Sequence, residues 1–298
     1  MSRYFRFIFF IFILICISCE INSVTPGFNS QSGKILFYAI HRDNPSYIRI
    51  YVLDGDGDRL TLIKEGFSSY PTWMLDKGAI AYQDLGDQII KVKYDEDGFS
   101  SEDSLCSYGM GITFIRYSEP LDCFLCQNQT QIFLLYPSTS ETIALMDTYD
   151  TAKNPVTSQN GKWIYFSTDI TGTFDIYRVD TNGKNYQKVL SDNINNLHTF
   201  SISADGKILV SPRYSGSKGD IILYDLIRKQ IIKTFRPFIP GIALYTSLSH
   251  DNRYIYFVNG IPDDYDTPRN VYRLEIENSE LIQLTDFDNY LACRPLAW

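Results

Sequence analysis

The stretch of sequence that decides the fold spans residues 154–190, and it reads NPVTSQNGKWIYFSTDITGTFDIYRVDTNGKNYQKVL. Four short segments rich in β-branched and aromatic residues are typical of strands, and turn signals separate them. The first turn carries Asn160-Gly161, which supplies the positive φ angles that a tight hairpin requires. The predicted strands are residues 155–158, 163–167, 175–179 and 186–190. One such sheet has too little core to be stable alone, so the stretch predicts neighbours of its own kind.

Five further units repeat this order of strands and turns. The six units start near residues 28, 71, 112, 154, 199 and 246, at spacings of 41 to 47 residues, and the second and third match the pattern least closely. Short strands with turn signals at such a period are the signature of a β-propeller. A β-sandwich would not repeat one turn pattern at one offset. The sequence therefore predicts an all-β, six-bladed propeller of four-stranded antiparallel blades over residues 28–298.

The two ends of the repeat region predict how the ring closes. The first unit lacks an opening strand, and residues 293–298 (CRPLAW) form an opening strand with no unit after it. The C-terminal strand is therefore expected to become the innermost strand of the blade begun by residues 28–64. This pairing would hide both sheet edges, which otherwise promote aggregation.

The motifs of these units resemble the WD40-like repeats of TolB-type propellers. The matching residues are Pro71-Thr72-Trp73, Asp205-Gly206-Lys207, Asp175-Ile176-Tyr177-Arg178-Val179-Asp180 and Leu284-Thr285. The resemblance implies the fold and leaves function open, because propellers include both binding proteins and enzymes. TolB itself carries an α/β domain ahead of its propeller, and the short segment in that place here leads us to expect none.

The N-terminus predicts export. Residues 1–18 carry Arg3 and Arg6, followed by the eleven apolar residues 7–17. A charged start and a short apolar run describe a signal peptide, and the run is shorter than the roughly 20 residues that span a bilayer.

The end of this leader, Cys16-Ile17-Ser18-Cys19, resembles the lipobox of bacterial lipoproteins, although Cys16 stands where that family usually has Leu. The resemblance implies lipidation of Cys19, a tether over residues 19–27 and a lipid-anchored location in the bacterial cell envelope, on the periplasmic or outer-surface side. Cleavage without lipidation and an uncleaved anchor are the alternatives.

The charge of the chain argues against nucleic acid as a partner. The formal net charge is −8, and loss of Arg3 and Arg6 with the leader takes it to −8 − 2 = −10. Phosphate binding needs a basic surface instead.

Two patterns are candidate metal sites. Asp54, Asp56 and Asp58, with Glu65 at the twelfth position, resemble an EF-hand calcium loop in spacing. However, Arg59 stands where that loop needs glycine, and the repeat alignment favours a solvated hairpin turn.

Among the three histidines, His41 and His198 are expected on one face and His250 on the other. Two histidines fall short of the three or four protein ligands that a metal site usually has. We therefore expect no metal and no cofactor.

The cysteines after Cys19 are Cys106, Cys123, Cys126 and Cys293. Cys123 and Cys126 are expected on opposite faces of one strand. A disulfide from Cys106 to one of them and buried free thiols are both compatible with the sequence.

The candidate binding surface is the face with the longest predicted loops, residues 213–220 and 259–270, which we call the loop face. Aromatic and acidic side chains mix there and suit a protein or glycan contact. With His41 and His198, the candidate residues are Tyr214, Asp263, Asp264, Tyr265 and Asp266.

The sequence contains no convergent set of catalytic groups. We therefore predict a non-catalytic envelope propeller that binds another envelope protein, or a glycan, through the loop face. The alternatives are a glycan-active enzyme, such as a polysaccharide lyase, and a sensor that binds a glycan or small ligand in the central pore.

Overall fold

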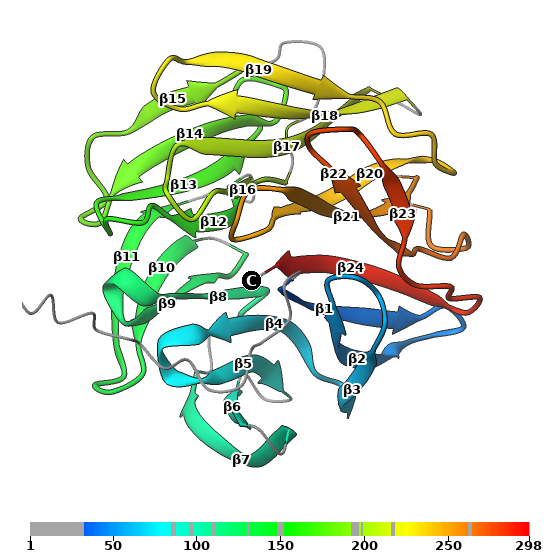
Figure 1. Ribbon diagram of the computed structural model, residues 1–298. Helices are drawn as coiled ribbons and strands as arrows, with labels where there is room; N and C mark the ends of the chain where they lie inside the picture. The colour runs from blue at the N-terminus through cyan, green and yellow to red at the C-terminus, as the bar shows by residue number, and fades with distance from the viewer. Residues whose placement is uncertain are drawn as a thin grey trace, which may run out of the picture.

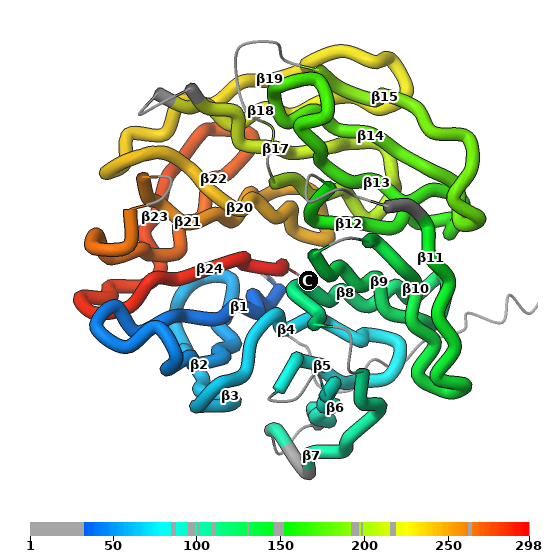
Figure 2. Tube along the Cα trace, turned by 180° about the vertical axis from the view of Figure 1, so that it is seen from behind, coloured from blue at the N-terminus to red at the C-terminus, as the bar shows by residue number. Residues whose placement is uncertain are grey.

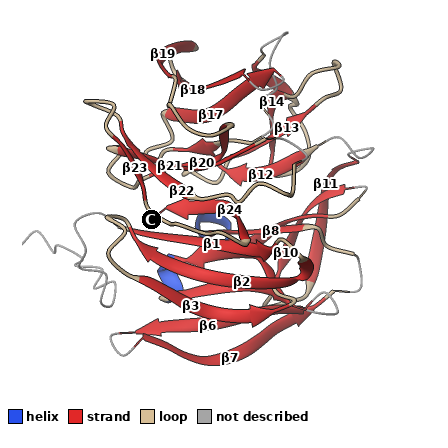
Figure 3. Ribbon diagram, turned by 90° about the vertical axis from the view of Figure 1, so that its right-hand side faces the viewer, coloured by secondary structure: helices blue, strands red, loops and turns tan. Residues whose placement is uncertain are grey.

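The computed structural model describes residues 33–84, 88–95, 98–108, 111–129, 131–147, 152–191, 197, 199–215, 218–261 and 264–297. In these residues, 24 strands form six four-stranded antiparallel sheets, arranged in a ring (Figure 1). The only helices in the described part are two single-turn 3-10 segments, η1 (Leu75–Lys77) and η2 (Glu119–Leu121) (Figure 3). No helix within these ranges is both long and apolar enough to cross a membrane. The predicted six-bladed propeller is confirmed.

Each blade runs from an innermost strand, beside the central channel, to an outermost one. From inside to outside, blade 1 consists of β24 (Tyr290–Ala297), β1 (Lys34–His41), β2 (Asn44–Asp54) and β3 (Leu60–Gly66); blade 2 of β4 (Ser69–Met74), β5 (Ala79–Asp84), β6 (Gln88–Asp95) and β7 (Gly98–Ser107); blade 3 of β8 (Phe114–Ser118), β9 (Cys123–Gln127), β10 (Gln131–Tyr136) and β11 (Glu141–Asp147); blade 4 of β12 (Lys153–Thr157), β13 (Trp163–Thr168), β14 (Asp175–Asp180) and β15 (Gln187–Leu190); blade 5 of β16 (Ser201–Ile202), β17 (Ile208–Ser215), β18 (Lys218–Asp225) and β19 (Gln230–Phe235); and blade 6 of β20 (Ile242–Leu248), β21 (Tyr254–Gly260), β22 (Val271–Glu275) and β23 (Leu281–Gln283).

The C-terminal strand closes the ring, as predicted. β24 pairs with β1 through Ile35–Ala297, Tyr38–Cys293 and four further residue pairs. It begins at Tyr290, before the predicted start at residue 293. Figure 2 shows β24 beside β1, and the chain ends at the centre of the ring.

The turns between the first and second strands follow the chemistry of the sequence. In blades 4, 5 and 6 a serine hydroxyl donates to the Asx side chain two residues later, over 2.9 Å from Ser158, 2.6 Å from Ser203 and 2.6 Å from Ser249. The residue after that Asx has a positive φ angle, as the Asn-Gly signal predicts: 67° at Gly161 and 70° at Gly206. We call the side on which these turns lie the hairpin face.

The core consists of six apolar clusters, and each lies between two neighbouring blades. One example joins Phe37 and Leu53 of blade 1 to Tyr256 and Val258 of blade 6, across the closure. Every blade thus buries both faces against its neighbours, which explains why a single unit is not stable alone.

The four cysteines Cys106, Cys123, Cys126 and Cys293 are buried free thiols. Cys123 and Cys126 belong to clusters on opposite faces of blade 3, as predicted. Burial raises the pKa of Cys123 to about 12, so this thiol stays protonated at neutral pH and is not a nucleophile.

Candidate functional site

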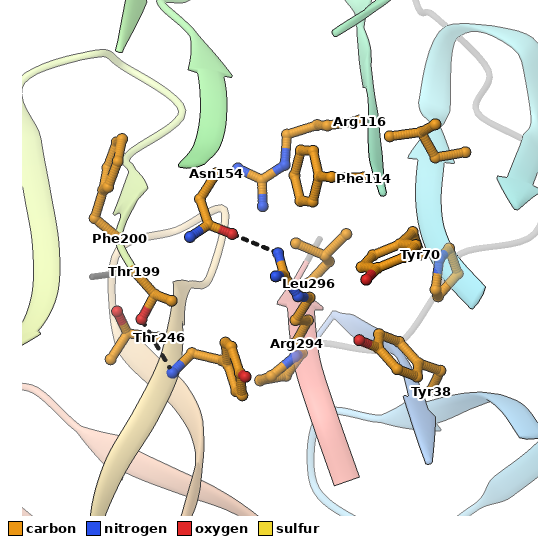
Figure 4. Close-up of a pocket in the computed structure, with 14 residues that line it drawn as sticks. Tyr38, Tyr70, Phe114, Arg116, Asn154, Thr199, Phe200, Thr246, Arg294 and Leu296 are labelled. Atoms are coloured by element: carbon orange, nitrogen blue, oxygen red, sulfur yellow. Dashed lines mark hydrogen bonds between the residues drawn. The ribbon is translucent and has the colours of Figure 1, made fainter. Parts of the chain in front are cut away.

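Four of the six innermost strands contain a bulge at the same level of the central channel. The residues at these bulges have positive φ angles, of 50° at Tyr70, 56° at Asn154, 53° at Tyr245 and 49° at Arg294. Such angles are unusual for residues other than glycine, and backbone strain of this kind gathers at functional sites. All four side chains line one pocket, to which each of the six blades contributes (Figure 4).

Arg294 occupies the centre of this pocket. Its guanidinium lies 5.3 Å from the ring centre of Tyr70, 5.0 Å from that of Phe114 and 5.4 Å from that of Tyr245. It also donates a hydrogen bond to the side chain of Asn154, which joins blade 1 to blade 4 across the channel (Figure 4). Cation–π contacts stabilise a partly desolvated guanidinium, so Arg294 is held in place by aromatic rings.

Arg116 is the second cation of the channel, and it projects from β8 toward the same pocket (Figure 4). Its guanidinium makes no hydrogen bond or ion pair with any residue in the described ranges, and its one ring contact is with Phe114 at 5.8 Å. Burial, with a smaller effect from the positive charge of Arg294, lowers the pKa of Arg116 to about 10. Arg116 is therefore charged at neutral pH, and its charge is poorly stabilised.

Three cavities follow one another along the channel. Around Arg294 the free space is only about 30 Å³, close to the share of liquid volume of one water molecule. The next cavity measures about 260 Å³ and shares Arg116 and Leu296 with the first. The third measures about 550 Å³ and lies among the turns of the hairpin face, where Glu119 and His250 line it. The channel thus widens from the two arginines toward the hairpin face.

The structure does not bring the predicted histidines together. His41 ends β1, its Nδ1 atom accepts a 3.2 Å hydrogen bond from the backbone N–H of Asp43, and its ring packs edge-on against Tyr290 at 5.0 Å. His250 lies on the hairpin face, as predicted, and lines the widest cavity. His198 falls outside the described residues, as does Cys19. No group of three potential metal-binding side chains occurs in the described parts of the chain.

The acidic stretch after β2 forms a turn, as the repeat alignment favoured. Asp54 accepts a 2.6 Å hydrogen bond from Lys34, and Asp56 accepts one of 3.3 Å from the backbone N–H of Asp58. Glu65 lies on β3 and pairs with Arg49 at 3.0 Å. These carboxylates are engaged within the blade, and the strands around them differ from the helices of an EF-hand.

On the loop face, a turn centred on Asp264 holds the predicted aromatic–acidic loop. The carboxylate of Asp264 accepts hydrogen bonds from the backbone N–H of Asp266 at 2.8 Å and the hydroxyl of Thr267 at 2.7 Å. Tyr265 is 61% exposed, with Arg269 beneath its ring at 5.6 Å. Tyr214 packs against the core of blade 6 instead, and Asp263 lies outside the described residues.

Sequence reasoning named neither Arg116 nor Arg294. A signal for Arg294 was present, because Tyr70, Asn154 and Arg294 each precede a proline at the same position of an opening strand. Arg116 lies in the third unit, whose weak match to the repeat hid its place at the channel.

Comparisons with known proteins support the fold. No protein-family model and no curated protein sequence matches the chain. Among solved structures, it is similar to TolB from Acinetobacter baumannii, with 18% identity and a TM-score of 0.71 over 92% of this chain and 68% of that one. A putative TolB from Agrobacterium tumefaciens matches with 12% identity and a TM-score of 0.62 over 87% of this chain and 91% of that one. An oligogalacturonate lyase in complex with manganese matches with 14% identity and a TM-score of 0.54 over 84% and 76% of the two chains. The chain therefore has a TolB-like propeller fold.

Proposed function

We propose that this chain is a non-catalytic binding propeller of the bacterial cell envelope, and that it takes its ligand in the central channel from the hairpin face. The observation that carries the proposal is the channel itself, which widens from two arginines to a cavity of about 550 Å³. A concave site with a few convergent polar groups is the usual form of a ligand site.

The side chains that line the channel favour binding over chemistry. They are mainly hydroxyl, aromatic, aliphatic and guanidinium groups. Glu119 and His250 are the ionisable groups of the wide cavity. The rival proposal, a polysaccharide lyase or other glycan-active enzyme, rests on the likeness to the manganese-bound lyase. It requires a metal or carboxylate cluster, and the separated positions of His41 and His250 do not favour one.

The loop face is a second proposed surface, for a partner protein of the envelope. The feature that favours it is the exposed Tyr265, which stands between Asp264 and Asp266 on a loop fixed by internal hydrogen bonds. An exposed aromatic ring on a rigid loop is typical of an interaction site.

One capture experiment separates the two surfaces. Immobilised protein is incubated with envelope extract, and the small molecules and proteins it retains are identified by mass spectrometry. Thr157→Trp fills the channel, since Thr157 lines the second and third cavities. We expect this variant to lose the retained ligand, while Thr234→Trp, on the exposed edge of blade 5, keeps it. Loss in Tyr265→Ser alone would assign binding to the loop face, and equal retention by all variants would contradict both surfaces.

We also propose that Cys19 carries the lipid that anchors the protein to the membrane. Metabolic labelling with a fatty-acid analogue is expected to mark the wild-type protein and not Cys19→Ala. Equal labelling of the two proteins would contradict the anchor.

A further inference from the structure

Arg116 stands at a position where other blades use a small hydroxyl residue to hold the ring together. In blades 2, 5 and 6 this residue accepts a hydrogen bond from a backbone N–H of the next blade. The three bonds run to Thr72 from Tyr117 at 3.0 Å, to Ser201 from Leu248 at 3.1 Å and to Ser247 from Ala297 at 2.9 Å. Arg116 pairs with Leu125 of β9 as Thr72 pairs with Ala81 of β5. The third blade thus replaces a structural hydroxyl with a cation that braces nothing.

The charge of Arg116 also lacks a counter-ion. No described carboxylate pairs with it, and the other cation of the pocket, Arg294, is already held by three aromatic rings and Asn154. Burying an unpaired charge is unfavourable, so the fold alone does not explain a guanidinium here. An anion in the channel would remove the cost.

Two hydroxyl groups without partners face the cavity next to Arg116. The hydroxyls of Ser118, which is 3% exposed, and of Thr157 make no hydrogen bond in the described structure, and both residues line the cavity of about 260 Å³. Ser118 is the counterpart of the turn serines Ser158 and Ser203, which donate to an Asx side chain. In blade 3, η2 replaces that turn and the hydroxyl loses its acceptor. Buried polar groups are normally paired, so these two hydroxyls indicate a missing acceptor.

We propose that Arg116, Ser118 and Thr157 form a carboxylate-binding site at the inner end of the channel. This assignment rests on the proposed function, because it names the ligand chemistry of the same channel. A guanidinium donates two parallel N–H bonds to the two oxygens of a carboxylate, and the hydroxyls can donate to the remaining lone pairs. The rest of the ligand lies in the cavity of about 550 Å³, toward Glu119 and His250.

Isothermal titration calorimetry on the full chain at pH 7 tests the site. The probes are D-glucuronate against D-glucose, and N-acetylalanine against its amide, so that the arms separate a sugar carboxylate from a peptide carboxylate. We expect at least one carboxylate to bind about ten-fold or more tightly than its neutral analogue, since a hydrogen bond to a charged group contributes more than a neutral one. Equal binding of charged and neutral probes, or no binding of either carboxylate, would overturn the carboxylate site. Retention of a neutral ligand in the capture experiment would still support the channel.

A pair of variants separates a binding role from a structural one. Arg116→Met is expected to weaken carboxylate binding about ten-fold to a hundred-fold, with Arg116→Lys in between. Arg228→Met makes the same change of charge on an exposed turn of blade 5 and should leave binding unchanged. Without ligand, Arg116→Met should unfold at the same temperature as the wild type or higher, because it removes a buried unpaired charge. Unchanged binding in Arg116→Met, or a melting temperature several degrees lower, would overturn the assignment.

Discussion

Removal of strand β24, by truncation after Asp288, is expected to abolish the folded propeller. The strand makes six residue pairs with β1 and buries Leu291, Ala292 and Cys293. Without it, β1 becomes an exposed edge with a run of buried apolar side chains, which promotes association of chains. The loss exceeds the roughly 5–15 kcal/mol by which a domain is stable. Circular dichroism and soluble yield measure the result.

The contacts of β24 reach beyond its own blade, which makes the expected effect large. Trp73 of blade 2 donates its indole N–H to the carbonyl of Leu296 over 2.9 Å, and Ser247 of blade 6 accepts from Ala297 over 2.9 Å. Arg294 adds the contact to Asn154 of blade 4. Three other blades are thus tied to one short segment.

A peptide of residues 288–298 provides the control for this truncation. Added in trans, it is expected to restore a cooperative thermal transition, whereas a peptide of the same composition in scrambled order should not. A truncated chain that melts cooperatively at the wild-type temperature would contradict the closing role of β24.

The sequence predicts the architecture well because turn chemistry is local. Asn160-Gly161 and Asp205-Gly206 form the expected turns, since positive φ at Gly161 and Gly206 costs a glycine little. The proline-led C-terminal segment predicts ring closure for a similar reason, because an opening strand without a unit has only one place to pair. Six repeats then fix the number of blades.

The channel could not be predicted in the same way, because its site depends on departures from the repeat. Arg294 and Asn154 lie 140 residues apart and meet only once the ring has closed. The bulges that turn them into the channel place positive φ angles at residues with side chains, which no local rule favours. The orphaned hydroxyl of Ser118 follows from a turn in blade 3 that differs from the others. Comparison of equivalent positions between blades, more than the search for known motifs, would have found these residues.

Asp175 is expected to be the most important single carboxylate for stability. It lies almost fully buried at the start of β14 and accepts hydrogen bonds from Lys188 at 2.8 Å, Thr171 at 2.9 Å and Ser191 at 2.9 Å. Burial alone would raise the pKa of Asp175, but the bonds from Lys188, Thr171 and Ser191 outweigh it and hold the pKa below its usual value. The ionised form is therefore the one that stabilises the fold.

Asp175→Asn is expected to destabilise the propeller by about 2–3 kcal/mol at pH 7, the range for hydrogen bonds to a charged group. Because the folded-state pKa is depressed, this contribution is present above the unfolded-state value of about 3.9 and is lost as the pH falls through the folded-state pKa. Thermal unfolding of wild type and variant should therefore differ at pH 7 and converge as the pH falls below about 4. Asp58→Asn, in the exposed turn after β2, should match the wild type at every pH. A difference between wild type and Asp175→Asn that persists undiminished into acid would show that the side chain acts through its shape and not through its charge.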